Sequence, residues 1–329
     1  MKQRLQDFVS HIRFGPKDAL IFRDQPTQST STPEADQLTQ VTEFVYKYLY
    51  THPSGDIAQA FRATPPDAKL IAKLSNANTT RADVQQEWVL RTALPDGAVI
   101  AERFGKVCKF LPGQFLADPM SLPIRTGSAL TVTHMTGTAL MQPGFFHMFG
   151  QEQMDLAEQA RTVRLYLNLK GAGAAEPAAA LLTGMLNSYK IPFTCKFATR
   201  LTDYSRADTA VLYLPQRFVR IFQLAFADIQ TALGAHLGAE VPAFTRRIAP
   251  GVGFAEDPTG EISFGAARSK LVAEAMLSSR ISHRMDTDKF WSEFLALCAA
   301  RGLDPDALHL NPGSSDTFYF PAEIAEVAA

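Results

Sequence analysis

The chain has 329 residues, 46% of them hydrophobic and 20% charged, which is enough to build a folded core and excludes overall disorder. Its 32 Lys and Arg residues balance 33 Asp and Glu residues, so the net charge of -1 argues against a bulk nucleic-acid binder and an acidic tail. The three cysteines (Cys108, Cys195 and Cys298) lie far apart, which excludes a disulfide framework and C-x-x-C motifs and predicts a reducing compartment.

The start of the chain and its hydropathy predict a soluble, cytoplasmic protein without a membrane partner. Residues 1–7 lack a hydrophobic secretion region, and no stretch approaches the roughly 18 apolar residues that span a bilayer. A non-cleaved export signal would escape this test, so secretion stays open as an alternative.

The first 160 residues give few strong signals of secondary structure. Residues 24–36 form a polar tract with two prolines, which predicts a loop, and apolar residues at helical spacing over 38–49 predict an amphipathic helix that ends near Pro53. Residues 98–101 and 129–133 are typical of strands.

The middle of the chain predicts a β-α-β-β-α order. In 163–169, Val163 and every second residue after it are aliphatic, while Arg164, Tyr166 and Asn168 share the opposite face. A helix over 177–190, strands over 192–197 and 208–214, and a helix over 215–236 follow.

A loop-rich segment over 240–265 and two helices around 266–280 and 287–301 complete the pattern. The predicted class is α+β, with a central mixed or antiparallel sheet surrounded by helices and preceded by a helical extension. No internal repeat of 20–50 residues is present, which excludes solenoids and propellers.

The sequence lacks the motifs of several common types of catalytic and nucleotide-binding site. It has no P-loop, G-x-G-x-x-G, H-E-x-x-H or G-x-S-x-G motif, and its seven histidines include no pair at metal-ligand spacing. We therefore expect no bound metal. Basic residues on strands and in Gly- and Pro-rich loops are the more informative feature.

Arg164, Tyr166 and Asn168 on one strand face could form an anion-binding floor, because a guanidinium grips phosphate through two parallel hydrogen bonds. A half-exposed strand with its polar side in water is the alternative.

Lys196 lies between apolar residues of the next predicted strand, where burial and neighbouring guanidiniums favour a neutral amine that acts as a general base. A lysine whose head reaches solvent explains the same pattern.

The segment 241–268 spends many Gly, Pro and charged residues on a predicted long loop, which favours a functional role over an idle one. The loop would display six polar or charged side chains around Gly251, Gly253 and Gly265: Arg246, Arg247, Glu256, Glu261, Ser263 and Arg268. Arg268 stands in the first turn of the predicted helix, beside free backbone amides. Pairing between the glutamates and arginines is the structural alternative.

Five ordered motifs between about residues 140 and 320 resemble the HopA-type family, which includes type III secretion effectors and the lyase partners of aminoglycoside-phosphotransferase-like kinases. The motifs are Arg164-x-Tyr166-x-Asn168, Pro192-Phe193-x-x-Lys196, Arg206-x-Asp208, the run from Val241 to Arg268, and Asn311-Pro-Gly-Ser-Ser-Asp316. Residues 1–135 resemble the family only loosely.

The resemblance implies elimination of phosphate from phosphoserine or phosphothreonine in a ribosomally made precursor peptide, as in class V lanthipeptide and thioamitide pathways, giving dehydroalanine or dehydrobutyrine. The order of basic residues is also similar to that of OspF-type phosphothreonine lyases, which implies an OspF-like core. By this analogy Lys196 is the base, Tyr166 or His147 is the acid, and Arg164, Arg206, Arg246 and Arg268 bind phosphate, with Asn168, Asp208, Glu256 and Glu261 in support. No cofactor is implied.

The resemblance divides the chain into a lyase core over 136–329 and an N-terminal region over 1–135, a possible peptide-docking region on account of aromatics such as Tyr46, Tyr48, Tyr50 and Trp88. Core packing explains these aromatics equally well. The implied partners are the phosphorylated peptide and the kinase. Two alternative hypotheses about function are a non-enzymatic effector and a phosphopeptide-binding scaffold.

Overall fold

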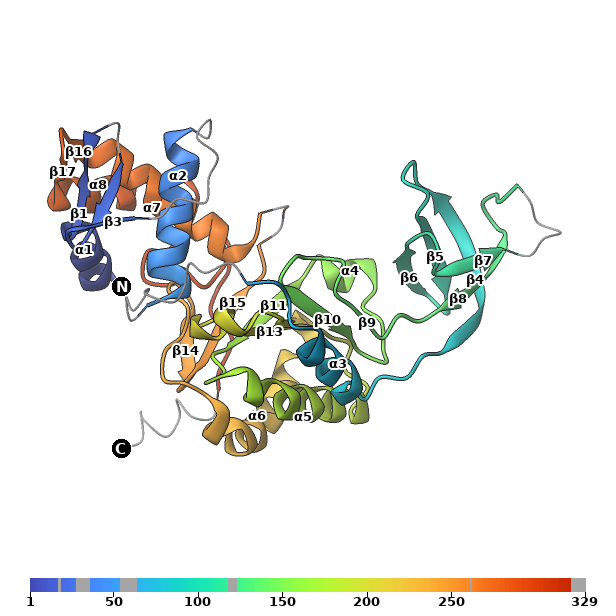
Figure 1. Ribbon diagram of the computed structural model, residues 1–329. Helices are drawn as coiled ribbons and strands as arrows, with labels where there is room; N and C mark the ends of the chain where they lie inside the picture. The colour runs from blue at the N-terminus through green and yellow to red at the C-terminus, as the bar shows by residue number, and fades with distance from the viewer. Residues whose placement is uncertain are drawn as a thin grey trace.

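The computed structural model describes residues 1–16, 19–27, 36–53, 64–117, 123–258, 260 and 262–320. Its centre is an antiparallel sheet, shown in Figure 1, whose strands run in the spatial order β14 (Arg246–Ala249), β15 (Val252–Glu256), β11 (Thr162–Leu167), β13 (Ala210–Pro215), β12 (Thr194–Ala198), β10 (Phe145–Phe149) and β9 (Gly137–Thr138). Helices cover parts of both faces, so the predicted α+β class with an antiparallel central sheet is confirmed.

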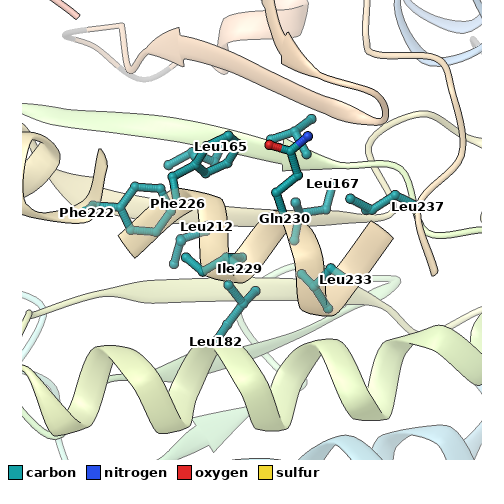
Figure 2. Close-up of a pocket in the computed structure, with 11 residues that line it drawn as sticks. Leu165, Leu167, Leu182, Leu212, Phe222, Phe226, Ile229, Gln230, Leu233 and Leu237 are labelled. Atoms are coloured by element: carbon teal, nitrogen blue, oxygen red, sulfur yellow. The ribbon is translucent and has the colours of Figure 1, made fainter. Parts of the chain in front are cut away.

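One face of this sheet packs on α3 (Ala68–Ala77), α5 (Ala175–Ser188) and α6 (Val219–Leu233). The aliphatic side of β11 lies in this core, as its alternation predicts. Figure 2 shows the leucines of β11 and β13 facing Leu182 of α5 and four apolar residues of α6. The cavity between them has a volume of only about 10 Å³, which is at most enough for a single water molecule. This region is therefore packed core.

The other face of the sheet packs on α1 (Lys2–Ser10), α2 (Gln37–Val45), α7 (Phe264–Ser279), α8 (Thr287–Ala300) and a π-helical turn over Tyr46–Thr51. Tyr166, Val211 and Ala255 contribute to this second core. The predicted helix over 38–49 and both C-terminal helices are confirmed. Helix α7 starts at Phe264 because the hydroxyl of Ser263 caps it by accepting a hydrogen bond from the Ala266 amide.

Two smaller antiparallel sheets complete the fold. One joins the chain start to the turn before α8, in the order β16 (Arg280–Ile281), β17 (Arg284–Met285), β1 (Ile12–Phe14), β2 (Leu20–Phe22) and β3 (Gln25–Pro26). The other contains β6 (Lys106–Phe110), β5 (Val99–Arg103), β4 (Val84–Ala93), β8 (Ala129–Thr133) and β7 (Phe115–Ala117), and Figure 1 shows it extending away from the central sheet beyond β9. Residues before 136 therefore contribute helices to both faces of the central sheet and strands to both smaller sheets.

The loop predicted over 240–265 is wrong in its central part, because strands β14 and β15 form a hairpin there. Gly251 turns the chain at φ +69, and a Cβ atom on it would lie 2.4 Å from the Gly238 carbonyl oxygen. Every residue of β15 is buried. Pro250 and Gly251 form the turn of this hairpin, whereas Gly253 lies within β15. The predicted loop over 24–36 contains β3 near its start, and residues 28–35 lie outside the described part.

Candidate active site

Four neighbouring strands of the central sheet place polar side chains on one uncovered part of its second face. Residues paired across an antiparallel ladder point to the same face, and the registers pair His147 with Lys196, Lys196 with Val211, and Arg164 with Tyr213. His147, Lys196, Arg164 and Tyr213 line a cavity of about 600 Å³, which we call the Lys196 cavity. Asp257, Gln142 and Ser263, the cap of α7, are among its other lining residues.

Lys196 holds its ammonium group between aromatic rings. Its Nζ atom lies 4.6 Å from the centre of the Phe145 ring and 5.7 Å from that of Tyr213, and it donates a hydrogen bond of 3.0 Å to the side-chain oxygen of Gln142. No carboxylate of the described residues lies within ion-pair distance of it. Burial lowers the pKa of Lys196 to about 8; the Asp208 carboxylate opposes this shift and the Arg164 charge adds to it.

Arg164 lies across the Tyr213 ring from β11, with its guanidinium carbon 5.0 Å from the ring centre. Its Nε and Nη2 atoms approach the Oδ1 atom of Asp257 at 2.8 and 2.5 Å. The same carboxylate accepts a hydrogen bond from the Thr162 hydroxyl at 2.9 Å. Asp257 therefore fixes the direction of the guanidinium.

His147, on β10, is 7% exposed and lies directly across the ladder from Lys196. Neither of its ring nitrogens has a hydrogen-bond partner among the described residues. Burial, followed by the charge of Lys196, lowers the pKa of His147 to about 4, so the ring is neutral near pH 7. A buried imidazole without partners is costly, so both ring nitrogens are available to a ligand or a water molecule in the cavity.

Tyr166 shares the strand face of Arg164 but does not line the cavity. Its side chain is 1% exposed and packs in the second core, with its ring 6.2 Å from that of Phe264 and 6.3 Å from that of Tyr50. Burial raises the pKa of Tyr166 to about 12. The alternation of β11 predicts its direction correctly, but α7 and the π-helical turn cover it.

Arg206 lies behind the cavity. Its Nε and Nη2 atoms donate to the two carboxylate oxygens of Asp208 at 2.7 and 2.8 Å, and Nη2 also lies 3.3 Å from the Tyr46 hydroxyl. Its guanidinium carbon is 5.8 Å from the centre of the Phe145 ring that also contacts Lys196. Arg206 therefore contributes its charge to the environment of Lys196, but it does not line the cavity.

The structure does not bring Arg246 and Arg268 to the Lys196 cavity. Arg246 stands on β14 and pairs with Asp316 at 2.7 Å. Arg268 is 5% exposed, and its guanidinium donates to the carbonyl oxygens of Leu308 and Leu310 at 2.8 and 2.7 Å. Both arginines instead hold the C-terminal segment against the sheet and α7, and the expected convergence of residues 164, 196, 206 and 268 reduces to Arg164 and Lys196.

Three of the expected supporting residues also have structural partners. Asn168 donates to the Glu240 carbonyl oxygen at 2.9 Å, Asp208 pairs with Arg206, and Glu256 accepts from the Asn311 amide at 2.7 Å. Glu261 lies outside the described residues.

The sequence did not indicate four further residues at or near the site: Asp257, Tyr213, Gln142 and Phe145. Their place there depends on strand register, which a single strand's pattern does not reveal. The alternation of residues 208–214 could have indicated Tyr213.

Within the described part of the chain, no group of three or more His, Cys, Asp or Glu residues could hold a metal ion. The described helices are each too short or too polar to cross a bilayer. The chemistry available at the cavity is that of an amine with a lowered pKa, a guanidinium oriented by a carboxylate, a neutral imidazole and the start of a 16-residue helix, whose amides favour anions.

Two Pseudomonas syringae effector structures are among the solved structures that this chain is similar to. The effector protein from Pseudomonas syringae pv. tomato strain DC3000 is 15% identical, with 86% of this chain and 93% of that chain covered and a TM-score of 0.47. The effector protein from Pseudomonas syringae pv. syringae strain 61 is 17% identical, with 82% and 88% covered and a TM-score of 0.44.

Comparison with curated proteins gives no match. The sequence model of the HopA1 effector protein family matches residues 136–310, which is more than half of the chain and includes all the strands that line the cavity. The chain therefore belongs to the HopA1 effector protein family.

Proposed function

We propose that the chain is a phosphoserine or phosphothreonine lyase, which eliminates phosphate from a kinase-phosphorylated ribosomal peptide without using a metal. The observation that carries the proposal is the joint presence of Lys196 and Arg164 in one cavity, where Lys196 has no ion pair to a described carboxylate and its pKa is lowered to about 8. An amine of this kind is partly neutral near pH 7 and can accept a proton.

In the proposed reaction the neutral amine of Lys196 takes the proton from Cα of the phosphorylated residue. The electron pair of the Cα–H bond forms the Cα=Cβ bond, the Cβ–O bond breaks, and phosphate leaves with that bond's electron pair. The products are dehydroalanine or dehydrobutyrine, inorganic phosphate and a protonated lysine, which returns its proton to solvent. No water is activated and no nucleophile receives the phosphoryl group.

Arg164 and the start of α7 are suited to hold the departing phosphate. A guanidinium and helix-terminal amides stabilise the growing negative charge on the leaving oxygen, an effect commonly worth about 10² to 10³ in rate for one donor. Asp257 positions Arg164 through the 2.8 Å hydrogen bond, and Arg206, which is bound to Asp208, acts only through its charge.

His147 is the better of the two candidate donors. It lies across the ladder from Lys196 and lines the cavity, whereas Tyr166 is covered by the second core. A neutral imidazole can donate its N–H to a leaving oxygen or to the carbonyl next to Cα, and an approaching phosphate dianion would raise the pKa of His147. An aminoglycoside-phosphotransferase-like kinase in the cytoplasm would supply the phosphorylated peptide.

Mass spectrometry of a phosphoserine peptide incubated with the protein tests this function. Elimination gives a product about 98 Da lighter, by the mass of phosphoric acid, whereas hydrolysis to serine gives one about 80 Da lighter. We expect the larger loss with the wild type and none with Lys196→Ala. Hydrolysis, or normal elimination by Lys196→Ala, would contradict the proposal.

A second candidate is a non-catalytic interaction protein of the effector type. The pairing of Arg164 with Asp257 and of Arg206 with Asp208 favours it, because basic residues with internal acidic partners are expected of a structural site. This candidate predicts that the same incubation leaves every phosphopeptide unchanged in mass.

A further inference from the structure

A second, more apolar depression lies beside the Lys196 cavity, where the outlying sheet meets the central one. We call it the apolar groove; it measures about 810 Å³. Phe110 and Leu111 at the end of β6 form one side, Leu140 and Met141 form the rim, and Phe149 of β10 and Phe193 form the base. Its size and its mostly apolar lining are typical of a ligand site.

Several contacts fix the outlying sheet at this place. Lys106 pairs with Glu152 at 3.7 Å, and the Cys108 thiol lies 3.7 Å from the Met154 carbonyl oxygen. His134, which follows β8, bonds to the Gly150 carbonyl oxygen at 2.8 Å. The sheet that contributes Phe110 and Leu111 is therefore held against the segment after β10, so the groove has a defined wall.

The groove is continuous with the Lys196 cavity. Six residues line both: Met141, His147, Gln159, Thr162, Tyr213 and Asp257. A molecule whose charged group sits by Lys196 and Arg164 can therefore extend into the groove without leaving the protein surface. The cavity and the groove differ in chemistry, since one presents cations and the other mainly apolar side chains.

The charged residues at the groove have nearby partners of opposite charge. Lys109 lies 3.3 Å from Asp96, and Glu152 is paired with Lys106. At the rim, Leu140 is 94% exposed, Met141 59% and Leu111 46%. Large apolar side chains gathered at the mouth of an apolar depression mark a binding surface, and the paired charges select against a highly charged occupant.

We propose that the apolar groove binds apolar residues adjacent to the phosphorylated residue of the peptide substrate, and so determines which phosphorylation sites the protein accepts. This inference rests on the proposed lyase function. The occupant is the flank of the same peptide whose phosphate enters the Lys196 cavity, because the two depressions share a wall. Three of the aromatic residues that the sequence suggests for peptide docking, Trp88, Tyr48 and Tyr50, are buried in the apolar cores and do not line the groove.

The test compares three fluorescent nonapeptides with a central phosphoserine. The first carries Leu, Val and Phe on its N-terminal side, the second carries them on its C-terminal side, and the third has Gly and Asn on both sides. Affinity is measured by fluorescence anisotropy in the Lys196→Ala background, so that no peptide is consumed. Phosphate release by the wild type is measured with the same peptides.

We expect one of the apolar peptides to bind about tenfold or more tightly than the Gly and Asn peptide, as burial of one or two large side chains allows. Leu111→Glu and Leu140→Glu should each remove most of this preference. The matched control is Leu116→Glu, which adds the same charge at an exposed leucine (74%) of β7 that does not line the groove, and it should leave the preference unchanged.

Equal affinity for all three peptides would overturn the inference, and so would a preference that survives both groove variants. Failure of the lyase function has a different signature. In that case the wild type releases phosphate from none of the peptides, whereas the affinity ratios still decide whether the groove reads the flank.

Discussion

Burial of Lys196 favours its use as a base but lowers the stability of the folded protein. A lysine with a pKa near 8 can serve as a base, but the burial that lowers the pKa also makes its charged form costly in the folded state. The pairing of Gln142, an uncharged acceptor, with the ammonium group is consistent with this balance, because a carboxylate at that distance would raise the pKa of Lys196 again.

Replacing Lys196 with methionine should therefore stabilise the protein at pH 7. The folded-state pKa lies below the unfolded value of 10.5, so the unfolded chain binds more protons between pH 8 and 10.5, and the stability of the wild type rises with pH over that window. Lys196→Met should raise the free energy of unfolding by about 1–3 kcal/mol at pH 7, and by less at pH 10.

Urea denaturation at the two pH values measures this difference. Lys69→Met, at an exposed position of α3, is the control and should show no comparable dependence on pH. A Lys196→Met protein that is less stable than the wild type at pH 7 would mean that the ammonium is well solvated or paired in the folded state.

At the scale of elements, the sequence predicts most of the strands and helices that build the site. Strict alternation in β11 identifies both its core side and the direction of Arg164, and the strands β12 and β13 and the helices α5 and α7 follow from periodicity. These patterns are local, since each depends on residues within one element.

What the sequence does not predict is how elements meet. The contact of Lys196 with His147 depends on the register of β10 with β12, and β10 itself was not predicted because its residues Phe145–Phe149 show no polar alternation. The sequence predicts a loop where the hairpin β14–β15 forms, and it does not indicate that Arg246 and Arg268 lie away from the Lys196 cavity. Arg268 lies on the predicted helix, one turn after its start at Phe264, and its side chain donates to the carbonyl oxygens of residues 308 and 310.

Arg268→Met should be destabilising without weakening the binding of a phosphopeptide. It removes two charge-assisted hydrogen bonds and leaves the Leu308 and Leu310 carbonyl oxygens without this buried donor, for which we expect a loss of about 2–4 kcal/mol in the free energy of unfolding. Thermal denaturation and anisotropy measure the two effects. Arg247→Met, at an exposed arginine of β14, should change stability by less than about 0.5 kcal/mol.

A phosphopeptide affinity that falls tenfold in folded Arg268→Met would contradict this interpretation and return Arg268 to the set of phosphate ligands.

At the scale of the whole molecule, the described chain has three separate apolar cores. Two lie on opposite faces of the central sheet, and the third fills the outlying sheet around Trp88, whose ring meets that of Phe110 edge-on at 4.7 Å. Because the outlying sheet has an apolar core of its own, it can unfold separately from the central sheet.

Trp88→Ala should therefore loosen the outlying sheet and spare the central one. The buried ring is 2% exposed, and its removal from a core of this kind commonly costs about 3–5 kcal/mol. Hydrogen exchange followed by mass spectrometry should show faster exchange over β4–β8, with β11–β13 unchanged. Equal acceleration in both sheets would mean that the molecule unfolds as one unit.

The proposed lyase reaction depends on the neutral amine of Lys196 acting as the base, and the pH dependence of elimination tests this most directly. With a phosphoserine peptide, kcat/KM should rise about tenfold per pH unit below pH 8 and level off above it, as the amine loses its proton with a pKa of about 8. The peptide phosphate, with a second pKa near 6, is already mostly a dianion between about pH 7 and 9. A rate that stays constant or falls over that interval would contradict the proposed reaction.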